Sequence, residues 1–268
     1  MGGLAAFVGF LAGLSILIAL DGMSNEDLLL ASLIAIMGAA FIGIIDDLFD
    51  MPQKFKAILP FVLALPFATV LPDDIVIPHV AVIYLGPMMV VAAAFAVTCA
   101  ANAANMLEGF NGLGTGLGII MALTLVVLSL MHSRTDGIYL LVPLLGALIA
   151  FLWFNKYPAE VFPGDTLMLF MGATIACAGI LSSLFVQTVF LFIPMIVEFF
   201  LKLRGGFLAE NYSSNAENGY LRYTGRIESL THIFMKRGSC TERGLVYRIW
   251  AMELVFCVIV VVVDGFIE

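Results

Sequence analysis

The chain has 268 residues, of which 62% are hydrophobic and 12% are charged, and its mean hydropathy is +1.08. A soluble domain of this length does not bury so much apolar surface, so the composition excludes a soluble globular protein and indicates one that crosses a membrane several times. The formal net charge is −8, and the predicted topology assigns the acidic excess mainly to one face of the membrane.

Apolar runs of about 17–22 residues, the length needed to cross a bilayer, recur along the whole chain. We therefore predict an all-α fold, a polytopic bundle of about nine transmembrane helices that forms one integral-membrane domain, residues 1–268. The predicted spans lie near residues 4–20, 29–46, 56–71, 81–101, 113–131, 138–154, 165–183, 186–203 and 245–264. One long hydrophilic loop, residues 205–242, separates the last two spans.

Basic residues predict the orientation of the bundle, since Lys and Arg concentrate on the cytoplasmic side of a membrane. If the loop after Asp47 is cytoplasmic, that side holds all but one of the 12 Lys and Arg residues, and Arg134 alone lies opposite. The basic residues of the predicted cytoplasmic side are Lys54, Lys56, Lys156, Lys202, Arg204, Arg222, Arg226, Lys236, Arg237, Arg243 and Arg248. The acidic residues of the other side are Asp21, Glu26, Asp27, Asp73, Asp74, Asp136, Asp264 and Glu268.

Two adjacent carboxylates, Asp46 and Asp47, end the second predicted span, and Lys54 and Lys56 follow a few residues later. Lysines at this place would by themselves be explained as topology signals, but a topology signal needs no carboxylates. Carboxylates that face lysines at a membrane surface can hold a metal ion and a phosphate together. This segment is the first candidate for a functional site.

Amide side chains and glycines gather at the inner end of the fourth predicted span. Asn102 and Asn105 are three residues apart and therefore share a helix face. Amide oxygens ligate Mg²⁺ without adding repulsion toward the phosphates of a diphosphate. Glu108 and Asn111 follow in a glycine-rich turn, where the backbone can approach a ligand closely. An Asn- and Gly-rich capping turn is the alternative, and this segment alone does not decide between the two.

Asp165 directly precedes the seventh predicted span, within Phe162-Pro-Gly-Asp165-Thr166. Taken alone, this residue is interpreted as the N-cap of the following helix. Together with the other clusters it is interpreted as a metal ligand. The long loop adds basic groups, which either attract anionic lipid headgroups or bind the phosphates of a nucleotide sugar.

These clusters, in this order, resemble the polyprenyl-phosphate N-acetylhexosamine-1-phosphate transferases of glycosyltransferase family 4. Asn105-Met-Leu-Glu-Gly-Phe-Asn111-Gly-Leu is similar to the Asn-x-Leu-x-Gly-x-Asn-Gly-Leu of the dolichyl-phosphate GlcNAc-phosphotransferase branch, whereas bacterial members usually have Asp at the place of Asn111. Phe162–Thr166 is similar to the Phe-x-Gly-Asp-Thr of that branch, and Thr241-Glu-Arg-Gly-Leu245 resembles the Glu-Arg pair before the family's final helix. The resemblance favours the archaeal members of the branch.

The resemblance implies a Mg²⁺-dependent enzyme, with Mn²⁺ as a compatible ion, that transfers GlcNAc-1-phosphate from a UDP-sugar to a polyprenyl or dolichyl phosphate. The products are UMP and a lipid-diphosphate sugar, which begins the assembly of a lipid-linked glycan for N-glycosylation or for a cell-envelope polysaccharide. The implied place is the cytoplasmic face of the cell membrane. The resemblance admits a homodimer and implies no nucleic-acid partner.

The resemblance also assigns roles to single residues. Asn105 and Asp165 are expected to hold Mg²⁺, and Lys56 is expected to contact phosphate. Asp46 and Asp47 are expected to orient or deprotonate the lipid phosphate, or to support the metal ion.

Four further residues are expected to bind the substrates. Asn111 is assigned to the nucleotide and Arg204 to the diphosphate, and Asn102 and Glu108 complete this group. The segment Glu198-Phe-Phe-Leu-Lys202-Leu-Arg204 stands where the bacterial translocase has a His-rich motif, so the sugar itself stays open.

The family has ten helices, and Met1-Gly-Gly-Leu4 is similar to the entry of its second helix, so the first helix is expected to be missing from this chain. One alternative is a bacterial-type phospho-MurNAc-pentapeptide or undecaprenyl-phosphate sugar phosphotransferase. A membrane transporter is a second alternative, but its path would need polar groups near mid-membrane and on both faces, whereas here they gather on one face.

Overall fold

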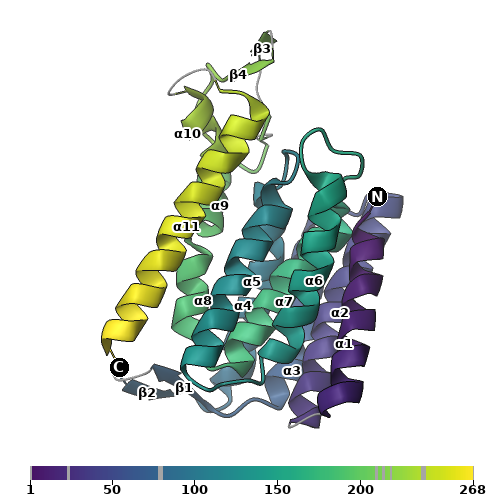
Figure 1. Cartoon of the computed structure of the whole chain (residues 1–268), viewed down its shortest axis with the longest axis vertical. Coiled ribbons are helices and arrows are strands. Elements are labelled where there is room, and N and C mark those ends of the chain that lie inside the picture. Colours follow the sequence, from purple (N-terminus) through teal and green to yellow (C-terminus); the bar gives the residue numbers. More distant parts are fainter. Residues whose placement is uncertain are drawn as a thin grey trace.

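Long helices run side by side along one axis, and short strands lie at both ends of the bundle (Figure 1). The computed structural model describes residues 2–22, 25–77, 81–208, 211–212, 215–217, 219–236 and 240–267, so Met1, Arg237 and Glu268 lie outside the described residues. The elements are α1 (Gly3–Asp21), α2 (Glu26–Phe49), α3 (Gln53–Thr69), β1 (Asp74–Ile77), β2 (Ala81–Tyr84), α4 (Met88–Leu107), α5 (Leu113–Met131), α6 (Ile138–Asn155), α7 (Gly164–Leu181), α8 (Phe185–Leu191), α9 (Ile193–Arg204), β3 (Asn215–Glu217), β4 (Tyr220–Arg222), α10 (Leu230–Lys236) and α11 (Glu242–Ile267).

Helices lie at all nine predicted spans. In the described part of the chain, 7 helices are long and apolar enough to cross a membrane, and the number is 8 if the bent pair of α8 and α9 is counted as one span. The remaining helix, α3, has only 17 residues and contains Pro60 and Pro66. An even number of crossings would return the chain to the end where it began, but the two termini lie at opposite ends of the bundle (Figure 1). We therefore count α3, which packs between α2 and α4, as a crossing.

Helix α7 is the centre of the bundle. Its span is 78% buried, and it packs against α1, α2, α4, α5 and α6. Small residues bring the backbones together: a Cβ atom on Gly172 would lie 2.4 Å from the carbonyl oxygen of Ala100, and one on Gly43 would lie 2.4 Å from the Cα atom of Thr166. Close approach through glycine is typical of helix pairs in membranes. It brings the inner end of α2 against the first turn of α7.

Two predicted spans differ in detail from the structure. The span expected at residues 81–101 begins with strand β2, and its helix runs instead over Met88–Leu107. The β-branched residues of 74–77 and 81–84 favour strands, and they form an antiparallel hairpin that the all-α prediction did not include. The helix pair of the span at 186–203 is bent by 57°. Pro194 lies in the first turn of α9 and cannot donate a backbone hydrogen bond, which explains the bend.

The long loop predicted at residues 205–242 contains secondary structure in its described residues. It contains a second short hairpin, β3 with β4, and the short helix α10. We call this segment, residues 205–241, the inner loop. It lies over the end of the bundle at which the N-terminus is found (Figure 1).

Candidate active site

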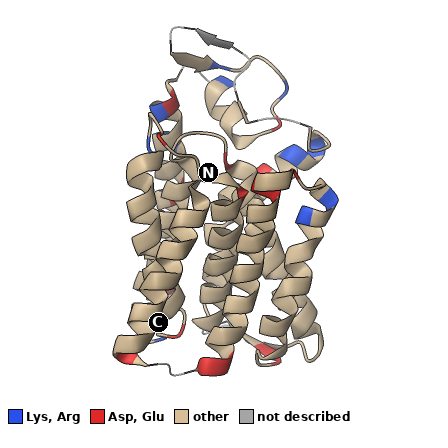
Figure 2. Cartoon of the chain, turned by 90° about the vertical axis from the view of Figure 1, so that its right-hand side faces the viewer, with Lys and Arg blue, Asp and Glu red and all other residues tan. Residues whose placement is uncertain are grey.

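Lys and Arg residues gather at the end of the bundle that carries the N-terminus and the inner loop (Figure 2). Helices α2 and α4 end there, and α3 and α7 begin there. The four predicted clusters therefore lie at the same end of the molecule.

A row of polar side chains joins these helices, and we call Asp46, Lys56, Asp165 and Asn105 the carboxylate–lysine row. The ammonium group of Lys56 lies 2.8 Å from Asp46 Oδ2 and also pairs with Asp165 Oδ2. The amide of Asn105 donates to Asp165 Oδ2 at 3.1 Å. Lys56 is 7% exposed, so its charge is held largely out of water between two carboxylates. The structure thus brings together four residues that are up to 119 positions apart, from Asp46 to Asp165.

Asp47 lies beside this row and binds the first turn of α7. Its Oδ1 accepts from the amide of Asp165 at 2.8 Å, and its Oδ2 accepts from the amide of Thr166 at 3.2 Å and from the Thr166 hydroxyl at 2.6 Å. The interpretation of Asp165 as the N-cap of this helix is therefore wrong, because a carboxylate from α2 binds these amide groups. The side chain of Asp165 is left to face Lys56 and Asn105.

Gly164 makes the contact of Asp47 with α7 feasible. Its φ is +65°, and a Cβ atom there would lie 2.4 Å from Asp47 Oδ2. We expect Gly164→Ala to displace Asp47, to lower the melting temperature and to reduce activity about tenfold or more, because a left-handed alanine alone costs about 1–2 kcal/mol. Gly146→Ala on α6 is the control, since a Cβ atom there meets nothing within 4 Å. Thermal unfolding and turnover measure both variants, and equal behaviour of the two would contradict the role given to Gly164.

The oxygen atoms of the row suit a hard divalent cation. Among the described residues, no group of three or more His, Cys, Asp or Glu side chains is arranged to hold a metal ion. The row nevertheless offers carboxylate oxygens from Asp46 and Asp165, and the Asn105 amide offers an oxygen when it is turned about its last bond. The Lys56 ammonium between the two carboxylates shows that this position accepts a positive charge. The donor set fits Mg²⁺.

The turn between α4 and α5 carries the predicted substrate-binding residues Glu108 and Asn111. Glu108 Oε2 accepts from the amide of Gly114 at 2.9 Å, and the amide of Asn111 donates to Glu242 Oε1 at 2.8 Å. Burial raises the pKa of the Glu108 carboxyl to about 7, against the lowering effect of hydrogen bonds from the amides of Gly114 and Gly109. The Glu108 carboxyl therefore holds the backbone of this turn through the amide of Gly114.

Arg204, unlike the residues of the carboxylate–lysine row, is bound to the inner loop. Its side chain is exposed, and its guanidinium donates to the carbonyl of Ile227 in the inner loop. Lys202 is two residues before Arg204 on the same helix and points in another direction. Its ammonium group donates to the carbonyl of Met106 at 2.6 Å, next to Asn105. Asn211 also reaches this turn, with bonds to the carbonyls of Met106 and Glu108. Sequence reasoning missed Asn211, because a single Asn in a polar loop carries no spacing signal.

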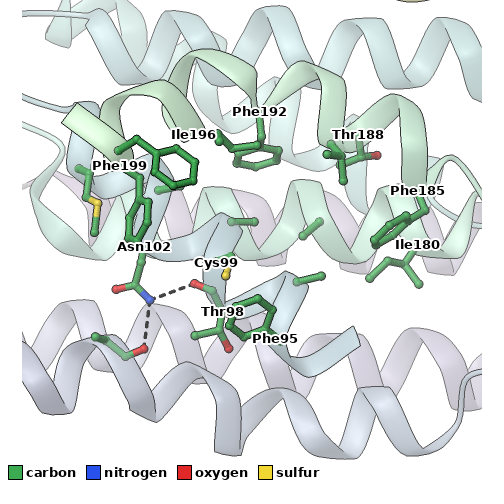
Figure 3. A pocket seen from close by; sticks show the side chains of 18 residues that line it. Phe95, Thr98, Cys99, Asn102, Ile180, Phe185, Thr188, Phe192, Ile196 and Phe199 are labelled. Carbon is green, nitrogen blue, oxygen red and sulfur yellow. Dashed lines mark hydrogen bonds between the residues drawn. The ribbon is translucent and has the colours of Figure 1, made fainter. Parts of the chain in front are cut away.

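An apolar groove of about 500 Å³ runs between α4 and the bent pair α8–α9, with α7 behind it (Figure 3). Asn102 lies at one end beneath Phe199, and Phe185 lies near the other end. The Asn102 amide donates to the carbonyls of Thr98 and Ala57, at 2.9 and 3.3 Å. The polar end of the groove is thus one helical turn from Asn105.

Comparison with known proteins supports the family resemblance of the sequence. The sequence profile of glycosyl transferase family 4 matches residues 29–183. A protein of Saccharolobus solfataricus, provisionally named as a UDP-N-acetylglucosamine–dolichyl-phosphate N-acetylglucosaminephosphotransferase, is 36% identical over 98% of this chain and 83% of its own length. The enzyme of that name from Schizosaccharomyces pombe is 30% identical over 65% of this chain and 44% of its own length. A phospho-N-acetylmuramoyl-pentapeptide-transferase of Borrelia garinii is 28% identical over 86% of this chain and 72% of its own length.

Proposed function

Because this chain belongs to glycosyl transferase family 4, we propose that it transfers GlcNAc-1-phosphate from UDP-GlcNAc to dolichyl phosphate. A phosphate oxygen of the lipid forms a bond to the β-phosphorus of UDP-GlcNAc. The bond from that phosphorus to the bridging oxygen breaks, and UMP leaves with the electron pair. The products are UMP and dolichyl diphosphate GlcNAc.

The observation that carries this proposal is the position of the apolar groove relative to the carboxylate–lysine row. Phe95 and Phe200 at the rim of the groove are each 61% exposed, so the groove opens toward the hydrocarbon side of the bundle. Its polar end at Asn102 adjoins Asn105. An isoprenoid chain in the groove would bring its phosphate to the carboxylate–lysine row. An apolar groove beside this row suits a lipid phosphate better than a water-soluble acceptor.

Both reactants are anions, so charge neutralisation and positioning supply most of the catalysis. Asn105 and Asp165 would hold Mg²⁺, or Mn²⁺, which when bound neutralises charge on the diphosphate. Lys56 contributes a fixed positive charge beside them and would contact phosphate. Asp46 holds Lys56 in place through its 2.8 Å contact. A general base is unnecessary, because a phosphate monoester with a second pKa of about 6 is largely ionised at neutral pH.

Asp47 acts on the same site through α7. Both of its oxygens accept hydrogen bonds from the first turn of that helix. Asp47 therefore sets the position of Asp165, and we assign it positioning rather than contact with the lipid phosphate.

The excess of basic residues at the end of the bundle carrying the row supports a cytoplasmic active site in the cell membrane (Figure 2). Residues 1–268 would form one integral-membrane catalytic domain. The homodimer, the absence of a nucleic-acid partner and the contacts of Asn111 and Arg204 with substrate stay predictions.

Purified protein in liposomes tests the proposal. UDP-GlcNAc with dolichyl phosphate should give UMP in a reaction that EDTA stops and that Mg²⁺ or Mn²⁺ restores. UMP formed only from UDP-MurNAc-pentapeptide and undecaprenyl phosphate would favour the bacterial-type reaction. Uptake of UDP-GlcNAc without UMP release would favour a transporter.

A larger side chain in the groove should affect the lipid substrate alone. Ala96 on α4 lines the groove, and we expect Ala96→Phe to raise the KM for dolichyl phosphate about tenfold, because overpacking costs about 1–3 kcal/mol. The KM for UDP-GlcNAc should stay the same. Val91→Phe is the control, since Val91 lies on the same helix, is 47% exposed and is not among the groove-lining residues. An equal rise of KM in both variants would contradict the lipid assignment.

A further inference from the structure

Glu198 on α9 is fully buried and is bound to the start of α10. Its relative exposure is 0%. Its Oε2 accepts from the hydroxyl of Ser229 at 3.0 Å and from the amide of Leu230 at 2.6 Å. The bent helix that lines the groove is thereby tied to the inner loop.

The contacts continue from the inner loop to the end of α4. The amide of Thr231 donates to the hydroxyl oxygen of Ser229 at 3.3 Å, and the hydroxyl of Thr231 donates to the carbonyl of Asn211 at 2.9 Å. The amide side chain of Asn211 donates in turn to the carbonyls of Met106, at 3.0 Å, and of Glu108, at 2.5 Å. Ser229, Thr231 and Asn211 are buried, so water does not compete for these bonds.

Lys202 links Glu198 to the end of α4. Its ammonium group lies 3.5 Å from Glu198 Oε1 and donates to the carbonyl of Met106 at 2.6 Å. A closed ring of polar contacts therefore runs from α9 to the inner loop, to the end of α4 and back to α9. We call these residues the buried ring, namely Glu198, Lys202, Met106, Asn211, Thr231 and Ser229.

The ring meets α4 where that helix needs partners. The last carbonyl groups of a helix have no partner within it, and α4 ends at Leu107. The carbonyls of Met106 and Glu108 are bound by Lys202 and Asn211. Side chains from α9 and the inner loop thus determine the path by which the chain leaves Asn105 and enters the turn of Glu108 and Asn111.

We infer that Glu198 is a positioning residue, which acts through Lys202 and the inner loop to hold the turn of residues 106–112 ready for the nucleotide sugar. The inference rests on the proposed function for the identity of that ligand. Glu198 itself touches no substrate, since its oxygens are enclosed by Ser229, Leu230 and Lys202. Its effect should therefore be larger on the binding of UDP-GlcNAc than on the binding of the lipid, since of the buried ring only Met106 lines the groove.

Two variants open the ring at different points. Glu198→Gln keeps the size of the side chain and one acceptor oxygen for Ser229 and Leu230, but it turns an NH₂ group toward Lys202. Thr231→Val removes the hydroxyl that donates to the carbonyl of Asn211 and keeps the branched shape. Glu160→Gln is the matched control, because Glu160 is exposed on the same face of the bundle and lies outside the ring.

Three measurements on the full-length protein in nanodiscs test the inference: calorimetric binding of UDP-GlcNAc, the KM for dolichyl phosphate, and hydrogen exchange of the amides of residues 107–113. Both ring variants should weaken UDP-GlcNAc binding about tenfold, as is usual when a group that orients a binding residue is removed. They should also speed exchange at residues 107–113. The KM for dolichyl phosphate should change less than the affinity for UDP-GlcNAc, and the Glu160→Gln protein should behave like the wild type.

Unchanged exchange at residues 107–113 in both ring variants would overturn the inference, as would a lower melting temperature with wild-type affinity for UDP-GlcNAc. An equal loss of affinity for both substrates would also overturn it. Absence of UMP release by the wild-type protein would overturn the proposed function instead, and hydrogen exchange would still show whether the ring holds the turn.

Discussion

Asp165→Ala should abolish UMP release, with a loss of about a thousandfold or more, while the protein stays folded. The side chain faces Lys56 and Asn105 at the centre of the carboxylate–lysine row. Its removal takes away the carboxylate expected to hold Mg²⁺. The N-terminal amides of α7 keep their partner, because Asp47 binds them.

Turnover and thermal unfolding of the same preparation measure this prediction. Glu160→Ala serves as the control, since it removes an exposed carboxylate from the same face. A melting temperature close to that of the wild type is expected for both variants. Ordinary Mg²⁺-dependent turnover by Asp165→Ala would show that the proposed site is wrong, and a loss of only about 1 kcal/mol of stability with activity retained would restore the capping role.

Lys56→Ala should reduce kcat/KM about a hundredfold or more, whereas Lys54→Ala should leave it within about twofold. Lys56 is 7% exposed and lies between the carboxylates of Asp46 and Asp165. Without its ammonium group these carboxylates repel each other and the incoming phosphates. Lys54 is exposed at the start of the same helix.

Steady-state kinetics with both substrates distinguish the two lysines, and protease accessibility of the inner loop confirms that each variant keeps its orientation in the membrane. Equal kinetic effects of the two substitutions would mean that the lysines serve topology alone. A defect of Lys56→Ala that appears only as misorientation would lead to the same conclusion.

Local composition is enough to predict the membrane bundle and the end of it at which the polar clusters gather. Span length and the placement of Lys and Arg depend on local composition, so both can be inferred from the sequence without knowledge of tertiary contacts. The same reasoning assigned Asp46, Lys56, Asn105 and Asp165 to one membrane face, because each of them lies at the same end of its span. The structure confirms that these residues meet.

The contacts of each carboxylate depend on how the helices pack. Asp46 and Asp47 are adjacent in sequence, yet one binds Lys56 and the other binds the first turn of α7. This division depends on the direction in which each side chain leaves α2 and on the close approach of α2 to α7 at Gly43, which no local pattern encodes. Asn211 likewise reaches the end of α4 only because the inner loop folds back over the bundle. Contacts between distant segments are set by packing, and packing is a property of the assembled helices.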